Sequence, residues 1–219
     1  MTAQATYAVV LDLDDTLYLE RDYVRSGFNA VGRHLAGQGV MEDFSERAWA
    51  LFESGLRNTI FDAALASSAS ISITELVEIY RAHQPDIALC PDAIRFLERF
   101  PANRPLGMVT DGPITSQAAK VRALGLEQRI SPIVMSDSFG VTFRKPHDRP
   151  FETIERALGV APERIVYIGD NPLKDFVTPR RRGWRTIRIR RPLGEHTARL
   201  MVGEYAAHTT VTTLDALDI

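Results

Sequence analysis

Short apolar runs recur along most of the chain and alternate with amphipathic segments. The runs occupy residues 7–11, 105–109, 132–135, 164–168 and 185–189, and several are rich in β-branched residues. Short runs of this kind are typical of strands that are buried on both faces, as in a parallel sheet. The pattern therefore predicts five strands that belong to one mostly parallel sheet.

Between the later runs, apolar residues recur at intervals of three and four, which is the spacing of one face of a helix. Glycines stand where two of these helices would end, at Gly125 and Gly159. The helical sets are Ala93, Leu97, Phe100; Ile114, Ala118, Val121; and Phe151, Ile154, Leu158, the last with Pro150 in its first turn. Strands that alternate with helices predict an α/β fold with a Rossmann-like, mostly parallel core.

Residues 19–89 follow a different pattern, because they show helical periodicity and no convincing strand. Ser72-Ile-Thr-Glu75 has the spacing of a capping box and introduces one of the helices. We interpret this segment as an all-helical insert of about four helices that follows the first strand. The α/β core then consists of two pieces, residues 1–18 and 90–219.

Composition and charge are those of an ordinary folded protein. The 219 residues are 45% hydrophobic and carry a net charge of −2, so no overall basic field favours nucleic acid or a membrane surface as a partner. Cys90 is the single cysteine, which excludes an intramolecular disulfide and fits a reducing cytoplasm. Residues 1–6 lack the pattern of a signal peptide and the run at 7–11 is too short to span a membrane, so we expect a cytoplasmic protein.

The first apolar run ends in the acidic segment Asp12-Leu-Asp14-Asp15. Side chains alternate along an extended chain, so Asp12 and Asp14 would point to the same side. Two carboxylates this close stay ionised only when a cation or hydrogen-bond donors offset their repulsion. The pair therefore invites a hard divalent cation such as magnesium, although an acidic turn or a helix cap is the simpler interpretation of Asp-x-Asp alone.

Further polar motifs follow two other predicted strands. They are Thr-Asp-Gly at 110–112 and Gly-Asp-Asn-Pro at 169–172, the second followed by Asp175, and Lys145 lies between them just before a predicted helix. Ligands of open α/β sheets bind beyond the carboxyl ends of the strands, so we expect these groups to converge at one edge. A hydroxyl, a glycine-flanked backbone and an ammonium group suit phosphate, although each motif taken singly is ordinary turn or surface chemistry.

In this order the motifs resemble those of the haloacid dehalogenase-like (HAD) hydrolase superfamily, and most of all its small-metabolite phosphatases. The resemblance covers nearly the whole chain, and the helical insert is similar to the type 1 cap of that family. The motifs that carry it are Asp12-x-Asp14-x-Thr16, Thr110, Lys145-Pro146 and Gly169-Asp170-x-x-x-x-Asp175. A helical cap domain inserted into a Rossmann-like core is the architecture that this resemblance implies.

The resemblance assigns the covalent chemistry to the first motif. Asp12 would be the nucleophile that attacks phosphorus and forms an aspartyl-phosphate. Asp14 would act as the general acid toward the leaving alcohol and then as the general base for water. Members of the family that release halide lack an acid at this position, because halide leaves without a proton. Asp14 therefore favours the cleavage of a phosphate ester.

The resemblance also assigns the binding of the phosphoryl group. Thr110 and the backbone N–H groups near Asp111 and Gly112 would hold the phosphoryl group during transfer. Lys145 would neutralise charge on the phosphoryl oxygens and on the nucleophile Asp12. Since positioning and charge stabilisation dominate phosphoryl transfer, we expect one lysine and one bound cation to stabilise the charge on the phosphoryl group.

Magnesium is the cofactor that the resemblance implies. Asp12 and Asp170 would bind the ion together with the backbone carbonyl of Asp14. Asp175 would ligate the ion or orient the groups that do. The metal site would thus draw on two strand ends that are far apart in the sequence.

These assignments predict a magnesium-dependent phosphomonoester hydrolase that acts on a small phosphorylated metabolite, a sugar phosphate or a nucleotide, as a monomer or homodimer. A phosphomutase on the same fold would carry the same motifs. A phospho-accepting signalling domain also gathers Asp, Thr and Lys around magnesium, but the late position of Thr110 and the acidic motif after Lys145 argue against it. A binding protein without catalysis would conflict with the complete set of motifs.

The insert is expected to govern substrate selectivity, because a cap can close over the site and exclude water. Tyr18, Arg21, Tyr23 and Arg25 lie where the chain leaves for the insert. Helix surface and packing within the cap are the simpler interpretation of these residues, and contact with substrate is the alternative.

Seven arginines lie between Arg180 and Arg191. Those at 180–182 would decorate a helix end, where cations are favoured. The alternation at 185–190 would turn Ile187 and Ile189 inward and leave the arginines outside. We therefore expect a solvated or edge role for these arginines, with binding of a phosphate-rich partner such as nucleic acid as the alternative.

Overall fold

The computed structural model describes residues 7–65 and 71–218. The chain divides into two compact units, residues 1–20 with 88–219, called the core unit below, and residues 21–87, called the helical unit. Residues 1–6, on which the expectation about a signal peptide rests, lie outside the described residues. Among the residues described, no helix has both the length and the apolar composition that a membrane crossing needs.

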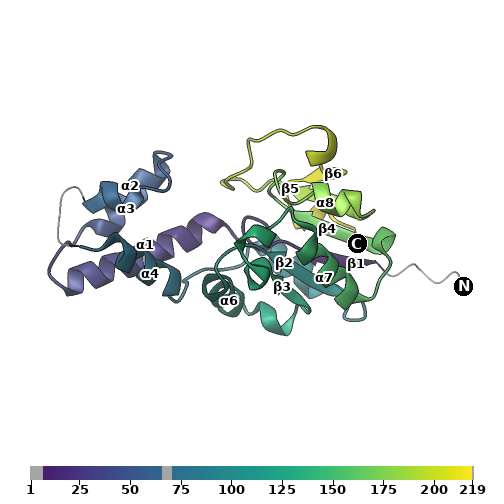
Figure 1. Cartoon of the computed structure of the whole chain (residues 1–219), viewed down its shortest axis with the longest axis horizontal. Helices are drawn as coiled ribbons and strands as arrows, with labels where there is room; N and C mark the ends of the chain where they lie inside the picture. The colour runs from purple at the N-terminus through teal and green to yellow at the C-terminus, as the bar shows by residue number, and fades with distance from the viewer. Residues whose placement is uncertain (1–6, 66–70, 219) are drawn as a thin grey trace, which may run out of the picture. The chain divides into compact units, whose positions relative to one another are not determined.

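The core unit is built around a six-stranded sheet in which every neighbouring pair runs parallel (Figure 1). The strands in spatial order are β3 (Ile133–Met135), β2 (Leu106–Thr110), β1 (Ala8–Leu11), β4 (Ile165–Gly169), β5 (Arg185–Ile189) and β6 (Thr209–Val211). This order, 3-2-1-4-5-6, is that of a doubly wound sheet with its switch point beside β1. The α/β, Rossmann-like fold predicted from the sequence is confirmed.

Burial explains which strands the sequence pattern found. Every residue of β1, β2 and β4 is buried, so these strands read as continuous apolar runs. Strand β6 is an addition to the five expected strands. It lies at the edge of the sheet, has only three residues and exposes Thr209 and Thr210, so no apolar run marks it in the sequence.

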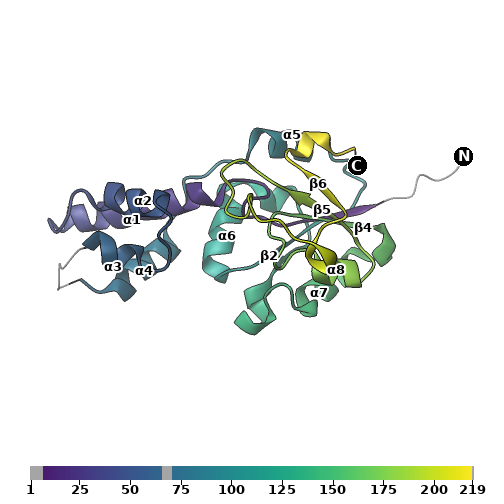
Figure 2. The same cartoon turned by 90° about the horizontal axis from the view of Figure 1, so that it is seen from above.

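Helices cover both faces of the sheet, with α5 on one side and α7 and α8 on the other (Figure 2). Phe151 of α7 is fully buried and packs edge-on against Tyr167 and Trp184. The elements are α5 (Pro91–Arg99), α6 (Ile114–Ala123), α7 (Asp148–Leu158) and α8 (Val177–Arg181), with 3-10 turns η1 (Leu126–Gln128), η2 (Ser136–Phe139), η3 (Val141–Phe143), η4 (Pro162–Arg164), η5 (Gly203–Tyr205) and η6 (Leu214–Ala216).

Helix α6 buries a different face from the one that its apolar spacing predicted. Ile114 is 46% exposed, whereas Gln117 and Lys120 are only 2% and 4% exposed. The predicted burial is therefore wrong for Ile114 and right for Val121, which is 1% exposed. Burial of a polar group without a hydrogen-bond partner costs about 1–3 kcal/mol, so the two polar side chains on this face need partners inside the core unit.

The helical unit has a hydrophobic core of its own. Within residues 21–65 and 71–87, the regular structure described is helical, as the sequence predicts: α1 (Glu20–Gly37, whose first residue belongs to the core unit), α2 (Phe44–Glu53), α3 (Ile60–Leu65) and α4 (Ile73–Ala82). Phe28, Leu35 and Phe44 are among its buried residues. Ser72 accepts a hydrogen bond from the Glu75 N–H and caps α4, which confirms the predicted N-cap.

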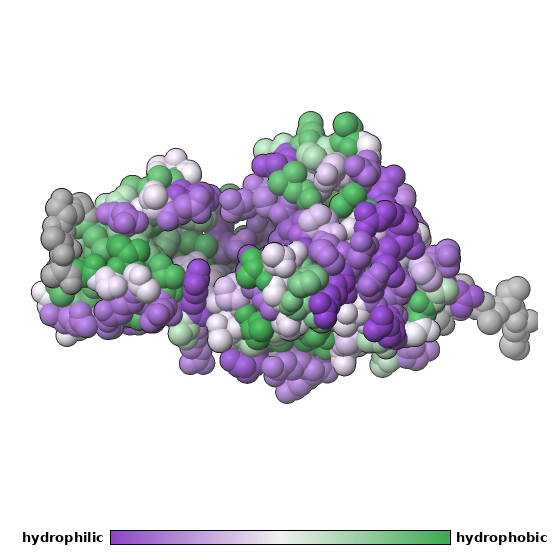
Figure 3. All heavy atoms as spheres, viewed as in Figure 1, coloured by the Kyte–Doolittle hydropathy of each residue, from purple (hydrophilic) through white to green (hydrophobic). Residues whose placement is uncertain are grey.

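Three residues at the start of the insert pack within the helical unit. The guanidinium groups of Arg21 and Arg25 lie 5.2 and 4.9 Å from the centre of the Trp49 ring. Tyr23 is buried and packs edge-on against Tyr80. Apolar side chains are also visible on the surface of this unit (Figure 3), because several of those around its core are only partly buried. These three residues therefore contact other side chains of the helical unit, as the interpretation as packing within the insert expects.

The expected solvated or edge role is wrong for two of the arginines. Arg188 and Arg191 are 5% and 6% exposed. Strand β5 is not an edge strand, since β6 pairs with it. The Arg188 guanidinium donates hydrogen bonds to three backbone carbonyls, those of Asp170, His196 and Arg199. A buried guanidinium can thus be satisfied by the backbone of loops that it holds in place.

Candidate active site

The polar motifs meet at the carboxyl ends of the three central strands. Asp12 follows β1, residues 110–112 complete and follow β2, and Asp170 follows β4. Strand β1 lies between β2 and β4, so these motifs are neighbours across the switch point of the sheet. Open α/β sheets bind their ligands at this place. The fold thus brings together groups that are up to 158 residues apart, from Asp12 to Asp170.

Lys145 joins the first and last motifs. Its Nζ lies 2.7 Å from Asp12 Oδ1, 2.8 Å from Asp175 Oδ1 and 3.0 Å from the Tyr167 hydroxyl. The side chains of Lys145 and Asp175 are fully buried. Burial would lower the pKa of Lys145, but the charges of Asp12 and Asp175 outweigh it and raise the pKa well above its usual value. Lys145 is therefore a fixed positive charge beside Asp12.

Three buried carboxylates form a group that could hold a metal ion. Asp12, Asp170 and Asp175 each offer one oxygen atom, and these atoms lie within 4.8 Å of one another. Burial raises the pKa of Asp12 to about 7 although Lys145 lowers it, and burial with the charges of Asp175 and Asp12 raises the pKa of Asp170 well above its usual value. Since oxygen ligands suit hard divalent cations, the donor set and its unbalanced negative charge fit magnesium.

The glycine before Asp170 allows this group to form. A Cβ atom on Gly169 would lie 2.5 Å from Asp175 Oδ2. That same oxygen accepts a hydrogen bond of 2.9 Å from the Asn171 N–H, so the loop after β4 is closed tightly on Asp175. Any larger residue at the end of β4 would push the Asp175 carboxylate out of the group.

The Asp14 carboxylate lies outside that group and has other partners. Lys120 Nζ lies 2.7 Å from Asp14 Oδ1, the Tyr18 hydroxyl donates to the same oxygen, and Gln117 Nε2 lies 2.9 Å from Oδ2. Burial would raise the pKa of Asp14, but the charge and hydrogen bond of Lys120, with those from Tyr18 and Gln117, lower it. Of the residues expected near the exit to the insert, Tyr18 is thus the one beside an acidic residue of the first motif.

Thr110 presents a polar atom without a partner. Its Oγ1 is buried and makes no hydrogen bond within the described part of the chain. A buried hydroxyl without a partner costs free energy, so such an atom at a strand end points to a ligand that supplies the missing contact. A ligand that accepts a hydrogen bond from the Thr110 hydroxyl would lie close to Asp12, because β1 and β2 are paired neighbours.

The side chain of Asp111 points into the protein and organises its surroundings. Asp111 Oδ1 accepts hydrogen bonds from the Ser136 hydroxyl at 2.6 Å and from the Lys145 N–H at 3.1 Å. Its Oδ2 lies 3.2 Å from Lys174 Nζ. Burial would raise the pKa of Asp111, but Lys145 and Lys174 with these hydrogen bonds lower it. The Asp111 carboxylate is therefore an ionised anchor for the loop that carries Lys145.

Gly112 has a backbone that other residues rarely adopt. Its φ is +131°, and a Cβ atom there would lie 2.9 Å from Gln117 Nε2. The Gly112 backbone forms a hydrogen bond with the Asp137 carboxylate, which is one of the contacts that lower the pKa of Asp137 after the larger effect of Arg144. This position thus lets Gln117 approach Asp14 while the loop stays closed.

Buried contacts from the C-terminal segment hold the first motif in place. Arg191 donates from Nε and Nη2 to the Thr16 carbonyl at 2.9 and 2.6 Å and from Nη1 to Asp92 at 2.9 Å. The Asp15 carboxylate accepts from the N–H groups of Glu20 and Glu195 at 2.9 and 2.8 Å. The segment after β5 therefore fixes the turn that follows Asp14.

Sequence reasoning missed four polar residues of this site. Tyr167 lies within an apolar run, and the other three, Gln117, Lys120 and Lys174, belong to none of the polar motifs. A signal existed in α6, where Gln117 and Lys120 stand three residues apart on the face that also holds Val121. The identity of their partner could not be read from the sequence, because Asp14 lies more than 100 residues earlier.

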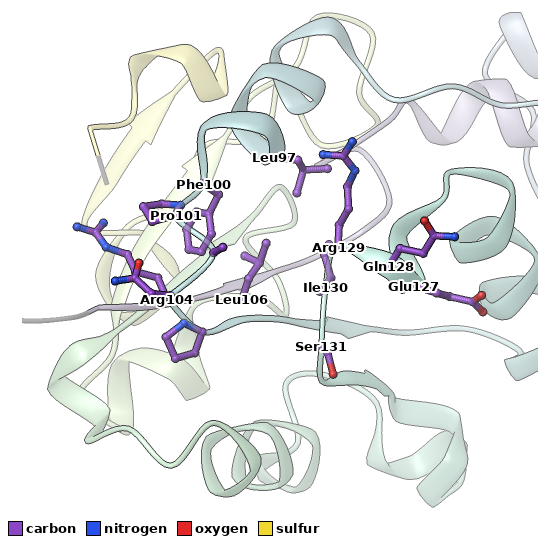
Figure 4. Close-up of a pocket in the computed structure, with 13 residues that line it drawn as sticks. Leu97, Phe100, Pro101, Arg104, Leu106, Glu127, Gln128, Arg129, Ile130 and Ser131 are labelled. Atoms are coloured by element: carbon purple, nitrogen blue, oxygen red, sulfur yellow. The ribbon is translucent and has the colours of Figure 1, made fainter.

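A pocket elsewhere in the core unit does not coincide with this site. It has a volume of about 390 Å³ and is lined by residues that include Leu97, Arg104 and Ser131 (Figure 4). Arg104 precedes β2 and Ser131 precedes β3, so the pocket lies at the amino ends of these strands. Thr110 ends β2 at the opposite edge of the sheet.

The chain matches known proteins over most of its length. The model of the haloacid dehalogenase-like hydrolase family matches residues 7–176, and a second model, of HAD-hydrolase-like proteins, matches residues 142–217. The glyceraldehyde 3-phosphate phosphatase of Methanopyrus kandleri is 29% identical over 202 residues, with 84% of each chain covered. The phosphoserine phosphatase of Thermus thermophilus is 28% identical over 223 residues, which cover 84% of this chain and 89% of the relative.

The solved structures give the same fold. The HAD-hydrolase YfnB of Bacillus subtilis, whose crystal structure contains bound magnesium, superposes with a TM-score of 0.70. The alignment covers 97% of this chain and 96% of that one at 20% sequence identity. At this identity the likeness establishes the arrangement of the chain in space and nothing about the reaction.

Proposed function

The chain belongs to the haloacid dehalogenase-like hydrolase family, and we propose that it is a magnesium-dependent phosphatase that cleaves phosphomonoesters of small metabolites through an aspartyl-phosphate. The observation that carries the proposal is the setting of Asp12. Its carboxylate lies 2.7 Å from the ammonium group of Lys145 and close to the carboxylates of Asp170 and Asp175, at the end of a central strand. The similar relatives that are named for glyceraldehyde 3-phosphate and phosphoserine support the class of reaction.

The metal would be held by the carboxylates of Asp12, Asp170 and Asp175 and by the backbone carbonyl of Asp14. Three buried oxygen donors within 4.8 Å of one another support this assignment. When bound, magnesium would neutralise negative charge on the phosphoryl oxygens. The raised pKa values of Asp12 and Asp170 follow from burial and mutual repulsion, which a divalent cation would offset.

In the first step Asp12 would attack phosphorus. A bond forms between an Asp12 carboxylate oxygen and phosphorus, the bond from phosphorus to the ester oxygen breaks, and Asp14 gives its proton to that oxygen as the alcohol leaves. Lys145 would hold Asp12 and balance its charge, and the Thr110 hydroxyl would bind a phosphoryl oxygen. The unpartnered Thr110 hydroxyl supports this role.

In the second step water would release the phosphate. Asp14 takes a proton from the water, the water oxygen bonds to phosphorus, and the bond between phosphorus and Asp12 breaks. The cycle ends with the proton on Asp14 and with Asp12 ionised. Against the effect of burial, Lys120 lowers the pKa of Asp14 in the free protein, and the negative charge of a bound phosphate ester would raise it again so that Asp14 carries the proton. A phosphomutase would instead pass the phosphoryl group back to an organic acceptor, and product analysis separates the two outcomes.

We also propose that the helical unit is a cap that selects the substrate. Its insertion between the first motif and the rest of the core supports this role, because the unit begins at residue 21, seven residues after Asp14. The proposed substrates are small phosphate monoesters, such as sugar phosphates, nucleotides or phosphorylated hydroxy acids. The unit has a core of its own, as an independently packed cap requires.

The test combines a substrate panel with one variant. The purified protein should release inorganic phosphate from p-nitrophenyl phosphate and from members of a panel of phosphorylated metabolites, and EDTA should abolish release. Asp12→Asn should remove the activity and the acid-stable phosphoryl label on the protein. Asp148→Asn, which changes an exposed carboxylate paired with Arg181, is the matched control and should leave turnover unchanged. Full activity in Asp12→Asn, or with EDTA present, would contradict the proposal.

A further inference from the structure

The Asp14 carboxylate is held by donors from two segments of the core unit. Lys120 Nζ at 2.7 Å and the Tyr18 hydroxyl both donate to Oδ1. Gln117 Nε2 donates to Oδ2 at 2.9 Å. Gln117 and Lys120 belong to α6, which begins directly after residues 110–112, whereas Tyr18 lies four residues after Asp14. The helix that follows the phosphate-binding segment thus also fixes the acid of the first motif.

The burial of these three polar side chains costs free energy unless each has a hydrogen-bond partner. Tyr18, Gln117 and Lys120 are 0%, 2% and 4% exposed. A buried ammonium group is tolerated only when it is paired, and its ion pair with Asp14 supplies a partner. The Gln117 amide is oriented so that its Oε1 is buried without a hydrogen-bond partner among the described residues. An arrangement that leaves a buried oxygen unpaired costs stability, which favours a functional over a stabilising role.

The direction of the hydrogen bonds selects one oxygen of Asp14. A carboxylate has about four acceptor positions, two on each oxygen. Lys120 and Tyr18 occupy both positions of Oδ1, and Gln117 occupies one position of Oδ2. The position that remains is on Oδ2. A carboxylate held in this way cannot rotate to offer Oδ1 without breaking three hydrogen bonds.

We infer that Gln117 and Lys120 are positioning residues for the phosphatase reaction, which fix the Asp14 side chain so that Oδ2 is the atom that exchanges the proton with the leaving group and with water. This inference rests on the proposed function, because it assigns geometry to the acid of that reaction. Lys120 acts through Asp14, whereas Gln117 also donates from Nε2 to the Asp111 carbonyl, and neither residue would touch the reacting phosphorus. Their effect should therefore depend on how much the leaving group needs a proton.

Two phosphate esters of similar size distinguish a positioning role through Asp14 from general damage to the phosphate site or to the fold. p-Nitrophenyl phosphate releases a stable phenolate and needs little help from an acid, whereas benzyl phosphate releases an alkoxide that must be protonated. Loss of the Lys120 ammonium should slow the first step for benzyl phosphate and leave it nearly unchanged for p-nitrophenyl phosphate. Damage to the phosphate site or to the fold would slow both esters equally.

The experiment measures alcohol or phenol release in the first turnover by rapid quench, with Lys120→Met and Gln117→Leu. We expect the Lys120→Met rate to fall about 10–100-fold for benzyl phosphate and less than about threefold for p-nitrophenyl phosphate, with KM nearly constant. Gln117→Leu should show the same selectivity with a smaller factor. Arg122→Met removes an exposed cation from the same helix and should match the wild type on both esters.

The outcomes distinguish this inference from the proposed function. An equal loss on both esters in variants that melt like the wild type, or no loss on benzyl phosphate, would overturn the positioning role. If Lys120→Met does not fold, the Gln117→Leu variant decides by the same comparison. A wild-type protein whose first turnover does not depend on magnesium would refute the proposed function itself. This measurement needs no variant, so it tests the proposed function separately from the positioning role.

Discussion

Lys145 Nζ lies 2.7 Å from Asp12 Oδ1, and the two side chains are 0% and 5% exposed. The contact joins the end of β1 to a loop 133 residues later in the chain. It is not strong enough to balance the burial of Asp12 and the nearby charge of Asp175, because the pKa of Asp12 still rises to about 7. The metal-free site therefore contains a carboxyl group that changes its charge near neutral pH.

Magnesium should bind more weakly as the pH falls below about 7. Only the ionised Asp12 can hold the cation, and burial, partly offset by Lys145, sets its pKa to about 7. Binding at this pH should release at least about 0.5 protons per ion, because Asp170, whose pKa is also raised, adds to the share from Asp12. Isothermal titration calorimetry in two buffers of different protonation enthalpy measures this number. An affinity that stays constant from about pH 6 to pH 8 would contradict the assignment of Asp12 to the metal.

Asp12→Asn should abolish activity and yet stabilise the metal-free protein at pH 8. The pKa of Asp12 is higher in the folded than in the unfolded protein, so ionised Asp12 costs stability at any pH above its unfolded pKa. Since each pKa unit corresponds to about 1.4 kcal/mol, we expect a gain of about 1–4 kcal/mol at pH 8 and little gain near pH 4. Urea unfolding with EDTA present at both pH values measures the difference. A variant less stable than wild type at pH 8 would argue against this sign.

Thr110→Val should separate ligand binding from stability. The Thr110 hydroxyl is buried without a partner among the described residues, so its removal should leave the free energy of unfolding unchanged or raise it by about 1 kcal/mol. Phosphate ester hydrolysis should fall about 10–100-fold, because the phosphoryl group loses a hydrogen bond. Thr110→Ser keeps the hydroxyl and should retain most of the activity. Equal activity in the valine and serine variants would exclude the proposed role.

Arg191→Met should destabilise the core unit by about 3–5 kcal/mol, since it leaves Asp92 and the Thr16 carbonyl without their buried partner. Arg181→Met breaks an exposed pair with Asp148 and should cost less than about 1 kcal/mol. Thermal and urea unfolding of both variants test this contrast. Comparable effects of the two substitutions would show that the Arg191 contacts contribute little.

The Arg191 effect should also depend on pH. Burial would raise the pKa of Asp92, but the Leu214 N–H and Arg191 outweigh it and lower the pKa. A lowered pKa contributes stability above the unfolded value, and that stability is lost as the pH falls through the folded value. The difference between wild type and Arg191→Met should therefore shrink below about pH 4.

Local sequence patterns predict five of the six strands, their alternation with helices and the motifs that follow β1, β2 and β4. Asp12, Thr110, Lys145 and Asp170 could be identified because strand burial and turn chemistry leave local patterns, and because parallel strands in a doubly wound sheet all end at one edge. The resemblance to a known family rested on the same local patterns. These features need no knowledge of which distant residues touch.

The partners of Asp14 and the burial of Arg188 and Arg191 depend on contacts between distant parts of the chain. Gln117 and Lys120 reach Asp14 because α6 turns its polar face inward, a rotation that its apolar spacing did not predict. Arg188 and Arg191 are buried because β6, a strand without an apolar run, covers β5 and because loops offer their carbonyls. The energy of a buried charge depends on donors and acceptors far away in the chain, and no local period records where they come to lie.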